Sequence, residues 1–203
     1  MRGEELAEEQ AALRRVATLV ARGVPPEEVF GAVTEEAGRL LSVEYAGLGR
    51  YEPDGGVTYV AVWGGAGDEL PVGHRWIPDE EGVGRIVFET RCPARIESLA
   101  DISGQLGVSA RKYAVGSGVG TPVIVEGRLW GVLATYSILG QPLPPNTEAR
   151  LANFTELVAT AIANAERVAV SSPGWQRNRR RCCGSRHSSR PGRVRRSCSR
   201  GSR

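Results

Sequence analysis

The strongest constraint on how this chain can fold is a change of composition at Ser171. The last 33 residues contain 11 Arg, 8 Ser, 4 Gly and 3 Cys, without Asp, Glu or Lys, and Trp175 and Val194 are their only large apolar residues. So little apolar surface cannot offset the entropy lost when a chain is ordered. We therefore expect residues 171–203 to form a disordered basic tail, and residues 1–170 to contain the whole hydrophobic core.

The tail repeats the start of the chain when its codons are read one base over. Each shifted codon joins the third base of one residue to the first two bases of the next, so the protein sequence alone restricts what it can encode. From Trp175 onward the shifted codons are compatible, at most positions and without a gap, with the residues 169 places earlier, beginning at Leu6. We interpret the tail as the frameshifted start of a second copy. A period this long indicates an array of whole domains.

Two functional interpretations of the tail were weighed against this one. A basic run can bind nucleic acid or a membrane surface, and a cysteine-rich run can bind metal. The tail has no interleaved aromatic residues, no helical periodicity and no paired ligand spacing. It carries a charge of +11, whereas residues 1–170 carry −8, which together make the net +3. Because the part expected to fold is acidic, we expect neither nucleic acid nor a membrane as a partner.

Residues 1–170 have the size and chemistry of one cytoplasmic domain. Their length suits a single core. Cys92 is their one cysteine, so no disulfide framework exists within them. The N-terminus is acidic and amphipathic rather than basic and then apolar, and no apolar run approaches the length of a membrane span.

Three helices are predicted from apolar residues spaced three and four apart. They cover residues 4–22, about 26–41 and about 147–169, and Pro26 followed by two glutamates is typical of a helix start. The first and last helices each carry an apolar seam, which in the last runs from Leu151 to Val168. From these seams we expect a parallel homodimer through the terminal helices.

The remaining pattern predicts an antiparallel sheet. Strands at about 45–51 and 57–63 flank a Pro-Asp-Gly-Gly turn, and strands at about 117–125 and 128–137 flank Glu126-Gly127. Pro122 inside a strand indicates an edge or a bulge. The segment 64–114 is mixed, with short strands at 76–77 and 94–96 and short helices at 82–90 and 103–112. The order α-α-β-β-mixed-β-β-α predicts an α+β fold, with a central antiparallel sheet and helices packed against it.

The segment from Leu13 to Ala169 resembles the GAF domain family. The resemblance lies in RVATLVARGVPPEEVFGAVTEEAGRLL, GLGRYEPDGGVTYVAVWG, SGVGTPVIVEGRLWGVLATYS and the closing helix LANFTELVATAIANAERV. It implies an N-terminal signalling helix at 1–22, a GAF domain at 23–170 and the tail at 171–203. The likeness is to GAF domains that stand in tandem at the front of bacterial sensor histidine kinases. That implies a non-catalytic sensory domain, which binds an unknown small molecule or relays conformational change to an output domain.

The resemblance also implies a small-molecule pocket between the sheet and the mixed segment. Its candidate lining residues are Trp63, Trp76, Tyr113, Thr121 and Tyr136. The alternative interpretation is that these side chains simply pack in the core, as most large apolar residues do. A ligand-free module for dimerisation or protein interaction is therefore the competing functional hypothesis.

No catalytic residue, metal ligand or cofactor is predicted. His74 stands in a polar Gly-rich loop, where a surface histidine is more plausible than a haem ligand. Cys92 has neither the adjacent histidine of bilin-binding GAF domains nor a second cysteine for redox cycling. Asp79, Glu80 and Glu81 are expected to be a solvated loop. A GAF-type methionine sulfoxide reductase would need several cysteines in the fold, so an enzyme ranks last.

The interpretation of the tail predicts the DNA that follows. Sequencing about 100 codons beyond the tail, roughly one domain length, should reveal a second GAF copy in the shifted frame. Its absence would refute the frameshift.

Overall fold

The computed structural model describes residues 2–65, 71–138 and 140–171. The chain divides into two compact units, residues 1–166 and 167–203, and the fold below is that of the first. The predicted tail lies outside the described residues from 172 onward.

Helices α1 (Arg2–Arg22), α2 (Pro26–Leu41) and α5 (Thr147–Ser171) correspond to the three long helices expected from the sequence. Pro26 occupies the first turn of α2, where its missing N–H costs no hydrogen bond. The helix ends at Ser42, which adopts the left-handed conformation with φ 50° and donates its N–H to Arg39 O. The described helices include none that is long and apolar enough to span a membrane.

Six strands form one antiparallel sheet in the order β3-β2-β1-β6-β5-β4, which confirms the predicted α+β class. The strands are β1 (Tyr45–Tyr51), β2 (Val57–Gly64), β3 (Arg75–Trp76), β4 (Ala94–Ile96), β5 (Val115–Val125) and β6 (Arg128–Ile138). The turn between β5 and β6 consists of Glu126 and Gly127, both with positive φ, as a tight hairpin requires. Pro122 lies beyond Gly120, which pairs with the first residue of β4, so its missing N–H faces an edge.

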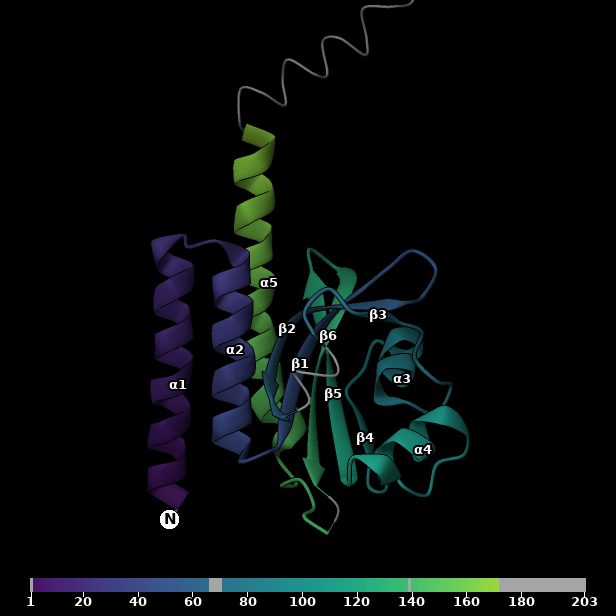
Figure 1. Cartoon of the computed structure of the whole chain (residues 1–203). Coiled ribbons are helices and arrows are strands. Elements are labelled where there is room, and N and C mark those ends of the chain that lie inside the picture. Colours follow the sequence, from purple (N-terminus) through teal and green to yellow (C-terminus); the bar gives the residue numbers. More distant parts are fainter. Residues whose placement is uncertain (1, 66–70, 139, 172–203) are drawn as a thin grey trace, which may run out of the picture. The chain divides into compact units, whose positions relative to one another are not determined.

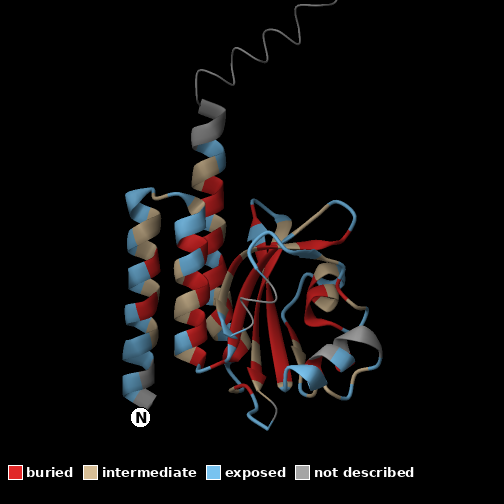
Figure 2. Ribbon diagram, in the orientation of Figure 1, coloured by how far each residue is buried: buried red, intermediate tan, exposed pale blue. Residues whose placement is uncertain are grey.

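One face of the sheet, here called the helix face, packs against α2 and α5 (Figure 1). The largest core cluster lies there. Phe154 and Val158 of α5, Val33 of α2 and Leu48 and Leu133 of the sheet are all fully buried. Figure 2 shows the same division, with buried residues on the strands and on the sides of α2 and α5 that face them.

Helix α1 packs within the same chain. Its residues Ala12 and Val16 are fully buried in the main core cluster. Arg15 donates two hydrogen bonds, of 2.5 and 2.6 Å, to the Glu36 carboxylate of α2. Glu9 forms an ion pair of 3.2 Å with Arg150 of α5, and both side chains are largely buried. Of the apolar residues that suggested a dimer seam on α1, Val16 is thus covered within one protomer, whereas Leu6 is 58% exposed and Leu13, Leu19 and Val20 are partly buried.

The opposite face, here called the distal face, lies toward α3 (Val83–Thr90) and α4 (Gly104–Lys112). A smaller cluster packs there, in which Val83 and Val87 of α3 contact Val132 and Ala134 of β6. Because the sheet is buried on both faces, alternate strand residues belong to two separate cores.

Replacement of Phe154 by Ala should remove the largest fully buried side chain of the helix face. We expect the free energy of unfolding to fall by about 3–5 kcal/mol. Urea denaturation followed by circular dichroism measures this loss. Leu6→Ala is the control, because Leu6 is 58% exposed and its loss should cost about 0.5 kcal/mol or less. Equal losses in the two variants would contradict the assignment of the core.

Candidate functional site

The distal face carries a cluster of aromatic side chains over positions where the strands have glycine. A Cβ at Gly47 of β1 would lie 2.8 Å from Tyr45 Oη and 3.0 Å from Tyr59 Cε1. A Cβ at Gly118 of β5 would lie 2.9 Å from the Tyr136 ring. Because these two glycines have no side chain, the three tyrosine rings can lie directly against the sheet.

The rings form a continuous aromatic layer. Tyr45 contacts Tyr59 edge-to-face at 6.3 Å between centroids and Tyr136 at 5.6 Å. Tyr59 stacks on Trp76 of β3 at 6.0 Å, with an interplanar angle of 22°. Such arrangements suit the quadrupoles of aromatic rings. The layer thus joins β1, β2, β3 and β6 on one face.

A second aromatic contact lies where α3 meets β1. Tyr51 packs against Phe88 of α3 at 5.0 Å. The Tyr51 hydroxyl donates a 2.5 Å hydrogen bond to Gly84 O, at the start of the same helix. The polar atom of this tyrosine is therefore satisfied, and it fixes α3 over the sheet.

Two buried polar atoms of the aromatic layer make no hydrogen bond of good geometry among the described residues, although the Tyr59 side chain between them has a weak hydrogen-bonding effect on both partners. The two atoms are Tyr45 Oη and Trp76 Nε1, which lie on either side of Tyr59. An unpaired buried donor or acceptor costs about 1–3 kcal/mol. Native proteins therefore rarely leave such atoms without a role. Both atoms are suited to a polar group supplied from outside the chain, since the indole donates and the phenol both donates and accepts.

Burial keeps the layer uncharged. Removal from water raises the pKa of Tyr45 and Tyr51 far above the usual value, and it does the same for Tyr59 and Tyr136. Neighbouring tyrosines add to the shift, because ionised phenols would repel one another. The site therefore presents neutral hydroxyls and aromatic edges over the whole physiological range.

The structure brings together only two of the five predicted lining residues. Trp76 and Tyr136 both belong to the aromatic layer, at opposite ends of the pair Tyr59 and Tyr45. Trp63 packs with the helix-face cluster, and its ring occupies the space that a Cβ at Gly38 of α2 would need.

Two further predicted residues lie away from the layer. Thr121 is 2% exposed and pairs with Leu133, a residue of the helix-face core, and its hydroxyl has no partner among the described side chains. Tyr113 is 44% exposed beyond the end of α4, where Lys112 Nζ lies 4.5 Å from its ring centroid.

A β-bulge explains the position of Trp63. In the pairing of β1 with β2, Leu48 faces Ala61 and Gly49 faces Tyr59, so Val60 has no partner. One extra residue reverses the alternation of the strand. Tyr59 consequently faces the distal side, whereas Trp63, four residues later, faces the helices.

Sequence reasoning missed Tyr45 and Tyr51, and it did not name Tyr59 among the aromatic candidates. A signal was present in YAGLGRY of β1, where Tyr45, Gly47, Gly49 and Tyr51 alternate and so share a face. Two glycines flanked by tyrosines indicate a surface that must leave room for rings. The pairing partners that supply those rings cannot be read from one strand alone.

The two reactive side chains discussed in the sequence analysis, His74 and Cys92, do not belong to the aromatic layer. His74 and Cys92 are both exposed. Within residues 2–65, 71–138 and 140–171, no group of three or more His, Cys, Asp or Glu side chains could hold a metal ion.

The antiparallel sheet with helices on both faces defines a domain of the α+β class. The profile of the GAF domain family matches residues 23–165, and the chain belongs to that family. GAF domains are sensory and ligand-binding signalling domains rather than catalytic ones.

Solved structures share this fold. The GAF domain of a phosphoenolpyruvate-protein phosphotransferase from Coxiella burnetii superposes with a TM-score of 0.66 at 18% identity, covering 81% of this chain and 98% of that one. The phycoerythrobilin-bound GAF domain of a cyanobacterial phytochrome gives 0.65 at 17% identity, covering 78% and 96%. A comparison with curated protein sequences found no match.

Alkaline titration should reveal the buried tyrosines. The folded-state pKa of Tyr45, Tyr51, Tyr59 and Tyr136 is raised, whereas tyrosines of the unfolded chain ionise near pH 10. Their contribution to stability is therefore complete below about pH 10 and is lost as the pH rises further. We expect tyrosinate absorbance of these four to appear together with unfolding, measured by absorbance and circular dichroism in parallel. Their ionisation in a still folded protein would contradict the buried layer.

Proposed function

We propose that this chain is the non-catalytic sensory part of a signalling protein, and that it binds an uncharged small molecule at the distal face. The observation that carries the proposal is the pair of buried atoms Tyr45 Oη and Trp76 Nε1, on either side of Tyr59, which make no hydrogen bond of good geometry within the described residues. A bound polar group that met them would remove a desolvation cost that the free protein bears.

The chemistry of the layer restricts the ligand. Trp76 Nε1 can only donate, so the ligand needs a hydrogen-bond acceptor there. The ring faces favour a planar or aromatic body. The tyrosines stay protonated because burial raises their pKa, so they offer no charge to an ionic ligand. A neutral, planar molecule with at least one carbonyl or ring nitrogen fits these requirements.

The proposed signal passes to an output domain downstream in the full protein, of the sensor histidine kinase class. The resemblance to GAF domains that precede such kinases supports this choice. Helix α5 is the natural route, because it packs on the sheet through Leu151, Phe154 and Val158 and runs on to Ser171. Small shifts of such a helix are a common way of passing a change to the next domain.

A ligand-free interaction module remains the alternative. In that case the aromatic layer is only a core, and association with a second copy would be the function. The homodimer through the terminal helices stays a prediction. Val16 of the α1 seam is buried within the protomer, whereas Leu6 of the same seam is exposed and open to a partner.

A thermal-shift screen of neutral planar metabolites tests the proposed ligand. We expect at least one compound to raise the melting temperature of the full chain, since a ligand that binds only the folded state stabilises it. Trp76→Phe keeps a ring on Tyr59 but removes the indole donor, and Tyr45→Phe removes the hydroxyl. Each should weaken binding about 5- to 10-fold, the value of one hydrogen bond.

Trp130→Phe is the matched control, because Trp130 packs against Phe30 on the helix face. It should leave the affinity unchanged. A library without any stabilising compound would favour the interaction module. A compound that binds all four proteins equally would place its site elsewhere.

A further inference from the structure

The edge strand β4 has only three residues, and their side chains lie on both faces of the sheet. Ala94 and Ile96 belong to the distal cluster, together with Tyr136. Arg95 lies between them, so strand alternation points its side chain to the helix face. The strand is therefore in contact with the candidate site on one side and with the start of α5 on the other.

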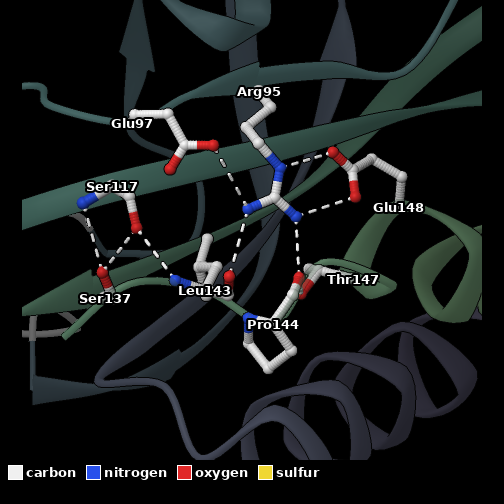
Figure 3. Close-up of polar contacts among 8 residues, drawn as sticks. All are labelled: Arg95, Glu97, Ser117, Ser137, Leu143, Pro144, Thr147 and Glu148. Carbon is white, nitrogen blue, oxygen red and sulfur yellow. Dashed lines mark hydrogen bonds and ion pairs between the residues drawn. The ribbon is translucent and has the colours of Figure 1, made fainter.

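Arg95 binds the beginning of α5 through four hydrogen bonds (Figure 3). Its Nε and Nη2 donate to the two carboxylate oxygens of Glu148, at 2.6 and 2.8 Å. Nη2 also donates to Pro144 O at 2.8 Å, and Nη1 donates to Leu143 O at 3.2 Å. The fork-like pairing fixes both distance and orientation, which a single charge contact would not.

This pair is more sheltered than the surface ion pairs of the chain. The side chains of Arg95 and Glu148 are 18% and 28% exposed. The Arg95 guanidinium, chiefly by hydrogen bonding, holds the pKa of Glu148 below its usual range. By contrast Arg85 and Glu89 of α3, which also lie 2.6 Å apart, are 35% and 55% exposed. Solvent screens the Arg95 pair less, so its geometry is better defined.

The loop before α5, which contains Leu143 and Pro144, is also hydrogen-bonded to the inner strands β5 and β6. The Leu143 N–H donates to Ser117 Oγ of β5 at 3.3 Å, and Ser117 Oγ is hydrogen-bonded to Ser137 Oγ of β6 at 2.8 Å (Figure 3). Leu143 itself is 4% exposed and belongs to the helix-face core. The start of α5 thus has a fixed anchor on β5 and β6 and a second anchor on the edge strand.

A single row of the sheet connects the aromatic layer to β4. Tyr45 pairs with Tyr136, Tyr136 with Gly118, and Gly118 with Ile96. The missing side chain at Gly118 lets the Tyr136 ring lie over β5, on the residue that pairs with Ile96. Tyr136 and Ile96 also pack against one cluster, which contains Ala94 of the short edge strand.

We propose that β4 is the coupling element of this domain, and that Arg95 converts a displacement of the Tyr136 ring into a change at the first turn of α5. This inference rests on the proposed sensory function, because it names how occupancy of that site would reach α5. Arg95 acts as a positioning residue. It touches no ligand, and its role is to make the start of α5 respond to the distal face.

Hydrogen–deuterium exchange of the full chain tests the coupling without any ligand. Tyr136→Leu removes the ring that lies over Gly118. We expect it to raise the exchange rate of amides at 143–150 by about 5- to 10-fold, the lower end of ordinary coupling between sites. In the Arg95→Gln background, the same substitution should cause no further increase there. Equal effects in the two backgrounds would overturn the proposal.

Matched variants separate coupling from general loosening. Arg85→Gln breaks a surface ion pair on α3 and should leave the effect of Tyr136→Leu unchanged. Glu148→Gln should reproduce Arg95→Gln and, because coupling is reciprocal, should also raise exchange at 94–96. If Arg95→Gln does not fold, Arg95→Lys retains the charge but loses the bidentate fork, and it should abolish the coupling equally. The two proposals can fail separately. A ligand screen without a hit would not affect the exchange test of coupling, and additive exchange effects would contradict the coupling but not ligand binding.

Discussion

A sheet buried on both faces is the constraint on which the rest of this structure depends. The buried strand residues belong either to the core under α2 and α5 or to the apolar cluster and aromatic layer of the distal face. A shift of one residue in the pairing register of a strand would move its side chains to the opposite face. The glycines at positions 47 and 118 are part of this constraint, because a Cβ at either would collide with the tyrosine rings.

The aromatic layer and the contact at β4 differ in their chemistry, and each suits a different one of the two proposed roles. The layer is neutral and leaves two polar atoms without a hydrogen bond of good geometry, which suits recognition rather than bond making or breaking. The contact at β4 is charged, sheltered and directional, which suits the transfer of a small displacement. Because β4 is an edge strand of three residues, it can shift at less cost than the long central hairpin of β5 and β6.

The succession of helices and strands was predictable, and the site was only partly so. Apolar spacing located α2, α5 and the β5–β6 hairpin, because those elements owe their stability to regular burial of one face. The resemblance to GAF domains named Trp76 and Tyr136, which lie at the two ends of the aromatic layer, and their role as a ligand pocket stays a prediction. Trp63 went to the opposite face because Val60 is bulged, and a bulge depends on the pairing with β1 rather than on the sequence of β2. Arg95 gave no sign of its role, since its partner Glu148 is 53 residues away.

By itself the sequence determined the fold class, which follows from local periodicity acting over neighbouring residues. The family was indicated by the resemblance of its motifs to GAF domains. Only the tertiary structure decided which side chains meet. Register across four strands brought Tyr45, Tyr136, Gly118 and Ile96 into one row, and it turned Arg95 toward α5. Such contacts join segments distant along the chain, so their geometry exists only after the sheet has paired and its two faces are covered.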